Sequence, residues 1–318
     1  MLTVAALAVK NNTPPQTGHA AEINRQARQN AAMSSRLAEQ IKYSPLSRLA
    51  AMPMRLRTGF VPVFRQAGQV LRWLLQSREW ANFSYDYDPV GLQAIICVLA
   101  ELTGRSHADL RGFAHELKSD TVFAERYHQR VAQTQLRWTS DPTLRYGRCM
   151  VNYMLVRASG ARVIFEAGTE RGLSTWAMCR ALQRNGAGGG AQRIYTVDIQ
   201  ADRGGFLAGD EGGLVRCLVG DSVVTLQGIT EPIDLFLHDT LNEAVHTRAQ
   251  LAALAPRLLP GSLLHACWFS AELAEFCEQQ GMRALEYTER VQDHWYPGAR
   301  AALAVMPRGV VATLPRAD

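Results

Sequence analysis

Val163-Ile-Phe-Glu166-Ala-Gly168-Thr-Glu-Arg-Gly172-Leu-Ser174 is the stretch that decides the fold of this 318-residue chain. An apolar run ends in an acid, two glycines follow, and a helical pattern begins directly after them. Glycine lets the backbone approach a ligand closely, and the free N–H groups at the start of a helix attract anionic groups. An ordinary tight turn between a strand and a helix would explain the pattern equally well.

Short β-rich runs alternate with helical stretches on the C-terminal side of this segment. Such alternation is typical of a parallel sheet with helices on both faces. It therefore predicts an α/β fold. The expected strands are 162–166, 194–198, 215–219, 233–238, 262–266, 283–287 and 301–306, and the expected helices are 173–183, 243–258 and 271–280.

Polar residues end four successive strands of this predicted sheet. Glu166 ends the first and Asp198 the second, Asp221-Ser222 follow the third, and His238-Asp239 end the fourth. Open α/β sheets bind ligands at the carboxyl ends of their strands, where an acid after the second strand suits the two hydroxyls of a ribose. Asp221-Ser222 is also a normal helix N-cap.

The series FEAGTERGLS, YTVDI, VGDS, DLFLHD and LAPRLLPGSLL resembles the class I S-adenosylmethionine-dependent methyltransferases. Within these it is most similar to the small-molecule and sugar O-methyltransferases related to the cephalosporin-hydroxylase-like and rhamnosyl O-methyltransferase families. The resemblance covers roughly 145–308. It implies a Rossmann-like, mostly parallel seven-stranded sheet in the order 3-2-1-4-5-7-6, with helices on both faces. It also implies in-line methyl transfer to the hydroxyl group of a small molecule, such as a sugar or a natural product.

Carried over to this sequence, the resemblance also implies where S-adenosylmethionine binds. Asp198 would hold the ribose hydroxyls, Asp221 and Ser222 would lie by the adenine, and Asp239 would lie near the transferred methyl. The residues expected around the methionine part are Glu166, Gly168, Thr169, Gly172 and Ser174.

A hydroxyl nucleophile benefits from a general base, and three residues at the predicted active edge qualify: Asp239, His265 and, third, His238. For each histidine a structural, hydrogen-bonded role is the competing interpretation. Phe83, Tyr85 and Tyr87 form a second group of candidates, because aromatic faces bind a sulfonium cation favourably.

The sequence departs from metal-dependent relatives, which carry paired acids after the fifth strand. Here His265-Ala266-Cys267 stands in that place, and Asn242 occupies the place of a histidine common in the family. Asp239 alone is a poor site for Mg²⁺, so we expect no metal. These departures leave open a catalytically degenerate Rossmann-like binding protein. An NAD(P)-dependent oxidoreductase is less favoured, because Gly168 and Gly172 do not give the G-x-G-x-x-G spacing.

Charge and composition predict the domain organisation. Residues 1–80 hold 11 Lys/Arg and 3 Asp/Glu, a net charge of +8, whereas residues 81–318 are slightly acidic at −3. We expect a polar, basic, partly disordered tail over 1–44, an all-helical cap over 45–142, the methyltransferase domain over 143–308, and a short tail over 309–318. Six cysteines without a CxxC pair favour a reduced, cytoplasmic protein.

The expected partner is a small-molecule acceptor. No nucleic-acid-binding module accompanies the basic segment, and no apolar run is long enough to span a membrane. Val61–Leu75 fits an amphipathic helix, so segment 45–76 makes weak peripheral contact with a membrane, packs on a partner, or, as is more common, packs on its own protein. A homo-oligomer is also left open.

Overall fold

The computed structural model describes residues 51–81, 84–186, 192–207 and 211–308, together with 22, 25–26, 28–29, 32–36, 40 and 49. Most of the predicted basic tail, the tail over 309–318 and the candidate aromatic Phe83 lie outside the described residues. The chain divides into two compact units, Met1–Ala67 and Gly68–Asp318. The second unit contains the whole sheet.

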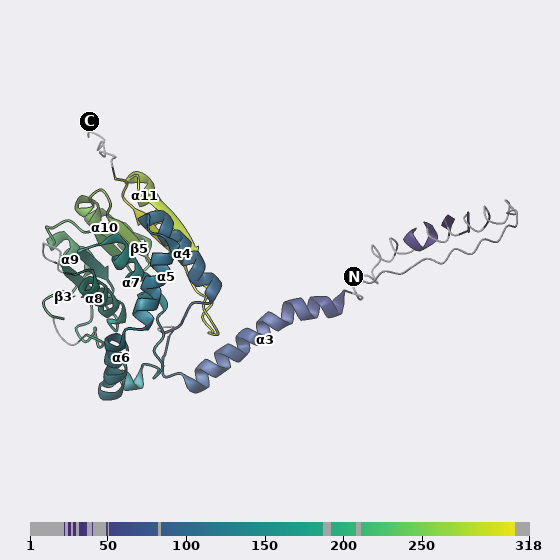
Figure 1. The fold of residues 1–318 in the computed structure, drawn as a ribbon, viewed down its shortest axis with the longest axis horizontal. Helices are drawn as coiled ribbons and strands as arrows, with labels where there is room; N and C mark the ends of the chain where they lie inside the picture. The colour runs from purple at the N-terminus through teal and green to yellow at the C-terminus, as the bar shows by residue number, and fades with distance from the viewer. Residues whose placement is uncertain are drawn as a thin grey trace, which may run out of the picture. The chain divides into compact units, whose positions relative to one another are not determined.

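Seven strands form one sheet in the order β3-β2-β1-β4-β5-β7-β6, which confirms the predicted topology. Two of them, β3 and β5, are labelled in Figure 1. β7 runs antiparallel to both of its neighbours, and the other neighbouring strands are parallel. The strands are β1 (Val163–Ala167), β2 (Arg193–Asp198), β3 (Val215–Val219), β4 (Leu235–His238), β5 (Leu263–Ala266), β6 (Arg283–Thr288) and β7 (Arg300–Val305).

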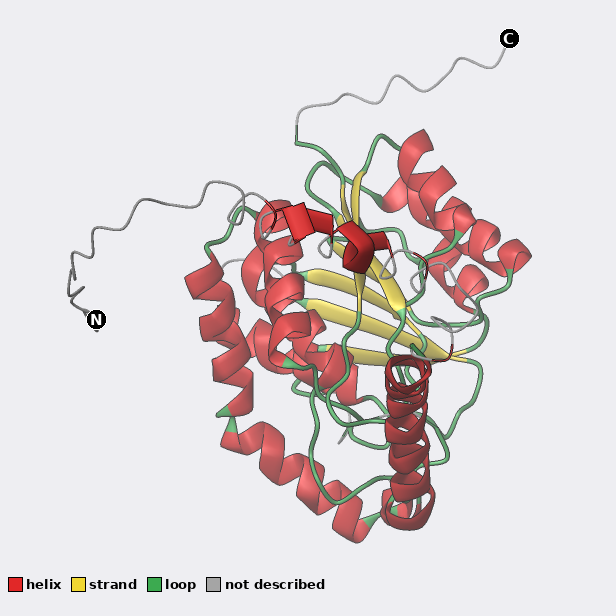
Figure 2. Cartoon of the chain, turned by 90° about the vertical axis from the view of Figure 1, so that its right-hand side faces the viewer, coloured by secondary structure: helices red, strands yellow, loops and turns green. Residues whose placement is uncertain are grey.

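Helices cover both faces of this sheet, and Figure 2 shows the strands enclosed between them. Alternate residues of a strand point to opposite faces, so Ile164 belongs to one apolar cluster and Phe165 to the other. The first cluster includes buried residues of α4 (Pro89–Thr103), α5 (His107–Lys118), α7 (Gly147–Ser159) and α8 (Leu173–Asn185). The second includes residues of α9 (Ser222–Gly228), α10 (Ala244–Leu254) and α11 (Ala271–Gln279).

The segment before the sheet is helical, as predicted. It comprises α3 (Met52–Gln76), α4, α5, α6 (Thr121–Gln133) and the 3₁₀ turn η1 (Gln135–Trp138). Ser106 caps α5 by accepting the N–H of Asp109 at 3.1 Å, as its position in the sequence indicates. Because α4 and α5 share an apolar core with α7 and α8, they are built into the sheet-bearing unit. The domain boundary at 142/143 stays a prediction.

None of the described helices is long and apolar enough to cross a bilayer. A second 3₁₀ turn, η2 (Ala255–Arg257), follows α10 and leads toward β5. All six cysteines are free thiols.

The turn between β1 and α8 allows the carboxyl ends of β1 and β4 to lie close together. Gly168 has φ +101° and Gly172 has φ +80°, conformations that residues with side chains rarely adopt. A Cβ on Gly168 would lie 2.1 Å from the carbonyl oxygen of Asp239, the residue after β4. Only glycine lets the ends of β1 and β4 approach so closely.

We expect Gly168→Ala to lower the free energy of unfolding by about 3 kcal/mol or more, because it combines backbone strain with a steric clash. Gly160→Ala is the matched control: φ is +69° there, and nothing lies within 4 Å of the added methyl. The control variant should lower the free energy of unfolding only by the backbone strain, about 1–2 kcal/mol. Urea unfolding of both variants measures the difference, and equal losses would contradict the clash.

Candidate active site

A cavity of about 340 Å³ lies at the carboxyl edge of the sheet, beside the β1–α8 turn. Six of the eleven predicted site residues line it: Glu166, Gly168, Thr169, Gly172, Ser174 and Asp239. The tips of β1 and β4 therefore contribute to one hollow. The other five predicted residues are not among its lining residues, and their surroundings explain why.

Glu166 is a buried carboxyl group on the cavity wall, with 2% of its surface exposed. Its Oε2 accepts hydrogen bonds from the hydroxyls of Thr175 and Thr196, the latter at 2.7 Å. Burial raises the pKa of Glu166 to about 7, although these hydroxyls favour the ionised form. Near neutral pH this group therefore changes its charge readily, and a bound cation would favour its ionised form.

Asp198, at the end of β2, supports the glycine turn. Its carboxylate accepts the backbone N–H of Glu170 at 3.0 Å and that of Gln200 at 3.0 Å. Glu170 has φ +44° and lines the cavity, so Asp198 stabilises an unusual backbone conformation beside it. A role for Asp198 in holding a ribose stays a prediction.

Asp221 and Ser222 stand at the start of α9, and His238 is the last residue of β4, with its side chain directed to α10. Asp221 caps α9 by accepting the N–H groups of Val223 and Val224 at 2.7 and 3.1 Å. Gln250 of α10 donates to Ser222 Oγ at 2.6 Å and is hydrogen-bonded to His238. Burial lowers the pKa of His238, which is consistent with a neutral ring in this network.

His265 is fully buried between α7 and β6. Its Nδ1 is hydrogen-bonded to Asn152 Oδ1 at 2.6 Å, and its Nε2 to the hydroxyl of Tyr287 at 2.8 Å. Burial, together with the nearby charge of Arg148, lowers the pKa of His265 to about 3. Because Asn152 Oδ1 can only accept, Nδ1 carries the proton and Nε2 accepts from Tyr287. Neither nitrogen is left for a substrate.

A buried ion pair behind the cavity was missed from the sequence. Glu289 is fully buried and accepts hydrogen bonds from the hydroxyls of Tyr85 and Tyr87, each at 2.8 Å, and from Arg148 Nε at 3.2 Å. Burial raises the pKa of Glu289, but the charge of Arg148 and its hydrogen bonds more than offset this, so the pKa lies below its usual value.

Arg148 connects this ion pair with the cavity. Its Nη1 lies 3.3 Å from Asp239 Oδ1, and the indole ring of Trp268 lies 5.6 Å from its guanidinium carbon. Arg148, Tyr85 and Trp268 all line the cavity. Both described aromatic candidates donate their hydroxyls to Glu289, and of these two Tyr85 also lines the cavity.

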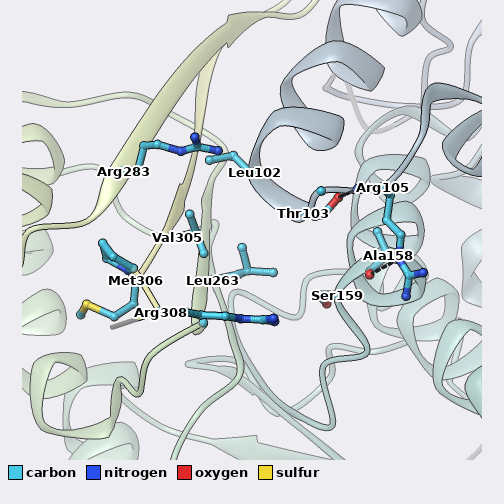
Figure 3. Close-up of a pocket in the computed structure, with 13 residues that line it drawn as sticks. Leu102, Thr103, Arg105, Ala158, Ser159, Leu263, Arg283, Val305, Met306 and Arg308 are labelled. Atoms are coloured by element: carbon cyan, nitrogen blue, oxygen red, sulfur yellow. Dashed lines mark hydrogen bonds between the residues drawn. The ribbon is translucent and has the colours of Figure 1, made fainter. Parts of the chain in front are cut away.

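A larger cavity of about 630 Å³ lies at the amino edge of the parallel strands (Figure 3). Two of its arginines have partners on the protein: Arg105 Nε donates to the carbonyl of Ala158 at 2.9 Å, and Arg283 Nη1 donates to Glu101 at 3.0 Å. The helix C-termini at Thr103 and Ser159 also border it. The carboxyl-edge cavity is the better candidate, because buried acids and aromatic rings surround it.

No cluster of three metal-binding side chains occurs within the described part of the chain. The absence of a metal from the reaction stays a prediction.

Comparison with protein families matches residues 165–266 to a family model described as a methyltransferase domain. Together with the strand order, this match confirms the prediction of a Rossmann-like methyltransferase domain. Among curated proteins, no sequence matches this chain.

Solved structures with a similar arrangement include three bacterial proteins. A putative O-methyltransferase from Klebsiella pneumoniae is 17% identical, covers 62% of this chain and 96% of its own, and has a TM-score of 0.44. The O-methyltransferase TomG from Streptomyces achromogenes, in complex with SAM, is 17% identical, covers 59% of this chain and 91% of its own, and has a TM-score of 0.43. An O-methyltransferase from Bacillus cereus, in complex with SAH, is 18% identical, covers 59% of this chain and 91% of its own, and has a TM-score of 0.43.

The raised pKa of Glu166 gives a test of its burial. The folded protein holds this proton more tightly than the unfolded chain, so the contribution to stability is full below about pH 4.5 and is lost as the pH rises to about 7. Relative to Glu166→Gln, which cannot ionise, the wild type should lose about 3 kcal/mol of unfolding free energy over this range. Urea unfolding at several pH values measures it; parallel curves for the two proteins would contradict the raised pKa.

Proposed function

We propose that this chain, whose residues 165–266 form a methyltransferase domain, uses S-adenosylmethionine to methylate the hydroxyl group of a small molecule. The observation that carries the proposal is the cavity at the carboxyl edge. There the glycine turn, the buried Glu166 and Asp239 meet in a methyltransferase domain. S-adenosylmethionine, when bound, supplies an electrophilic methyl group on a positively charged sulfur.

The side chains around the cavity fit the methionine half of this cofactor. An α-ammonium group and a sulfonium are both cations, and the cavity wall offers the carboxyl groups of Glu166 and Asp239 and the rings of Tyr85 and Trp268. Carboxylates and aromatic faces both attract cations. The glycine turn brings backbone close to the same hollow. Asp198 supports this turn and is the proposed partner of the ribose.

Asp239 is our choice as general base among the three predicted candidates. It lines the cavity, its side chain is 41% exposed, and Arg148 holds it at 3.3 Å. His265 and His238 are buried in hydrogen bonds to the protein, which supports structural roles for both. Asp239 would accept the proton of the acceptor hydroxyl, while Arg148 orients its carboxylate.

The acceptor would bind in the same cavity, beside Tyr85, Arg148 and Trp268. Tyr85 and Trp268 offer apolar surface there, and Arg148 offers hydrogen-bond donors, a combination that suits a hydroxylated ring compound. A sugar or a natural product remains the proposed class of acceptor, and a cytoplasmic location remains a prediction.

S-adenosylhomocysteine should bind and NAD should not, as measured by isothermal titration calorimetry. Asp198→Ala should lower the affinity for S-adenosylhomocysteine at least tenfold, because it removes the proposed ribose contact and loosens the Glu170 turn. Asp202→Ala, in the exposed turn nearby, makes the same charge change and should leave the affinity within twofold. NAD binding, or equal affinities of the two variants, would contradict the assignment.

Asp239→Asn should lower kcat at least 100-fold, since a carboxamide cannot accept the proton. The affinity for S-adenosylhomocysteine should stay within threefold, because this molecule lacks the positively charged sulfonium near which Asp239 is expected. His265→Ala should chiefly lower the melting temperature, because it leaves Asn152 and Tyr287 without their buried partner. Turnover with an identified acceptor, together with calorimetry and thermal unfolding, separates the two effects. Full activity of Asp239→Asn would exclude it as the base. An inactive but folded and cofactor-binding His265→Ala would restore His265 as the candidate.

A further inference from the structure

α3, labelled in Figure 1, is a 25-residue helix with no buried residue. It presents many exposed apolar side chains. Exposed apolar side chains along it include Leu56, Phe60, Val63, Phe64, Leu71 and Leu74, whose exposed fractions run from 48% to 68%. Isolated exposed apolar residues are normal on protein surfaces, but a contiguous group marks an interaction site.

These side chains share one face of the helix. At 3.6 residues per turn, successive residues are about 100° apart, which places the six in a sector about 100° wide. Thr58, Gln66 and Gln69 lie on the opposite side, together with two exposed apolar residues, Met54 and Val61. Trp73 also lies there, and its ring packs on Trp295 with centroids 5.0 Å apart. This contact involves the side of α3 that lies away from the six exposed residues named above, which we call the apolar face.

The charge of α3 is strongly one-sided. The helix contains Arg55, Arg57, Arg65 and Arg72 and no acidic residue. Arg57 lies at the border of the apolar face, whereas the other three lie outside it. An amphipathic helix with apolar residues on one face and arginines at its margin and on the polar face is typical of helices that lie in the interface of a bilayer.

We infer that α3 lies on an anionic lipid surface, with the apolar face in the acyl boundary and its arginines against lipid phosphates. A helix of 25 residues is about 37 Å long, and α3 lies flat in this arrangement, because no described helix is apolar enough to span. The long arginine side chains reach from the helix toward the headgroups while their aliphatic stems cover apolar surface.

Charge complementarity favours lipid over other occupants of this face. A second copy of α3 packed on the same face would bring eight arginines together with no acid on either helix. A nucleic acid would neutralise the arginines but leave Phe60, Phe64 and Leu71 in water. An anionic bilayer satisfies both sets of side chains. It also agrees with the net charge of +8 over residues 1–80.

The test is co-sedimentation of the full-length chain with sucrose-loaded vesicles. We expect the partition coefficient on phosphatidylcholine vesicles with 30% phosphatidylserine to exceed that on pure phosphatidylcholine at least tenfold. Phe60→Gln/Phe64→Gln should lower partitioning at least tenfold on the anionic vesicles. Thr58→Ala/Gln66→Ala, on the polar side of the same helix, is the matched control and should bind within twofold of the wild type.

Arg55→Gln/Arg65→Gln tests the electrostatic half separately, and should lower binding to the anionic vesicles about 30-fold. If circular dichroism shows that the phenylalanine variant does not fold, the arginine variant alone tests whether α3 binds the vesicles. Absence of vesicle binding by the wild type would overturn the inference. So would unchanged binding by either folded double variant. A dimer in sedimentation velocity that Phe60→Gln/Phe64→Gln dissociates, without vesicle binding, would assign the face to a second copy instead.

Discussion

The close approach of Gly168 to the carbonyl of Asp239 is the constraint on which the candidate site depends. β1 and β4 are neighbours in the sheet, and their last residues pair in register. No side chain fits at Gly168, because its Cβ would lie 2.1 Å from the Asp239 oxygen. Because Gly168 has no Cβ, the chain can bring Glu166, which precedes the turn, and Asp239, which follows β4, to the same cavity.

The buried pair of Arg148 and Glu289 connects this sheet edge to two distant parts of the chain. Removing both charges from water costs several kcal/mol per ion, which an ion pair repays only when its remaining hydrogen bonds are satisfied. Glu289 meets this condition: besides Arg148, it accepts from Tyr85, from Tyr296 and from the backbone N–H of Ala299. Arg148 thus lies between a fully buried acid and a half-exposed one, Asp239, and a single guanidinium serves both.

The strands were predictable because their signals are local, whereas their order in the sheet followed from the family resemblance. Each strand is a short apolar run bounded by turn residues, and the observed bounds fall within two residues of the expected ones. The site was predictable only in part, because a strand end alone does not say to which side a side chain points. His238 and Asp239 are adjacent, yet His238 bonds Gln250 in the helical layer while Asp239 lines the cavity. Arg148 and Glu289 are 141 residues apart, and no local pattern relates them.

The electrostatics of the cavity also bear on what it can bind. Glu166 has a raised pKa, because burial penalises its charge and Asp239 adds a second negative charge nearby. Arg148 is already committed to Glu289 and Asp239 and does not bond Glu166. A cation that entered beside Glu166 would therefore meet a carboxyl group with no opposing charge and would favour its ionised form. An anion there would face two acids, so the part of the cavity beside Glu166 favours a cation, while Arg148 and Arg171 supply positive charge elsewhere on the wall.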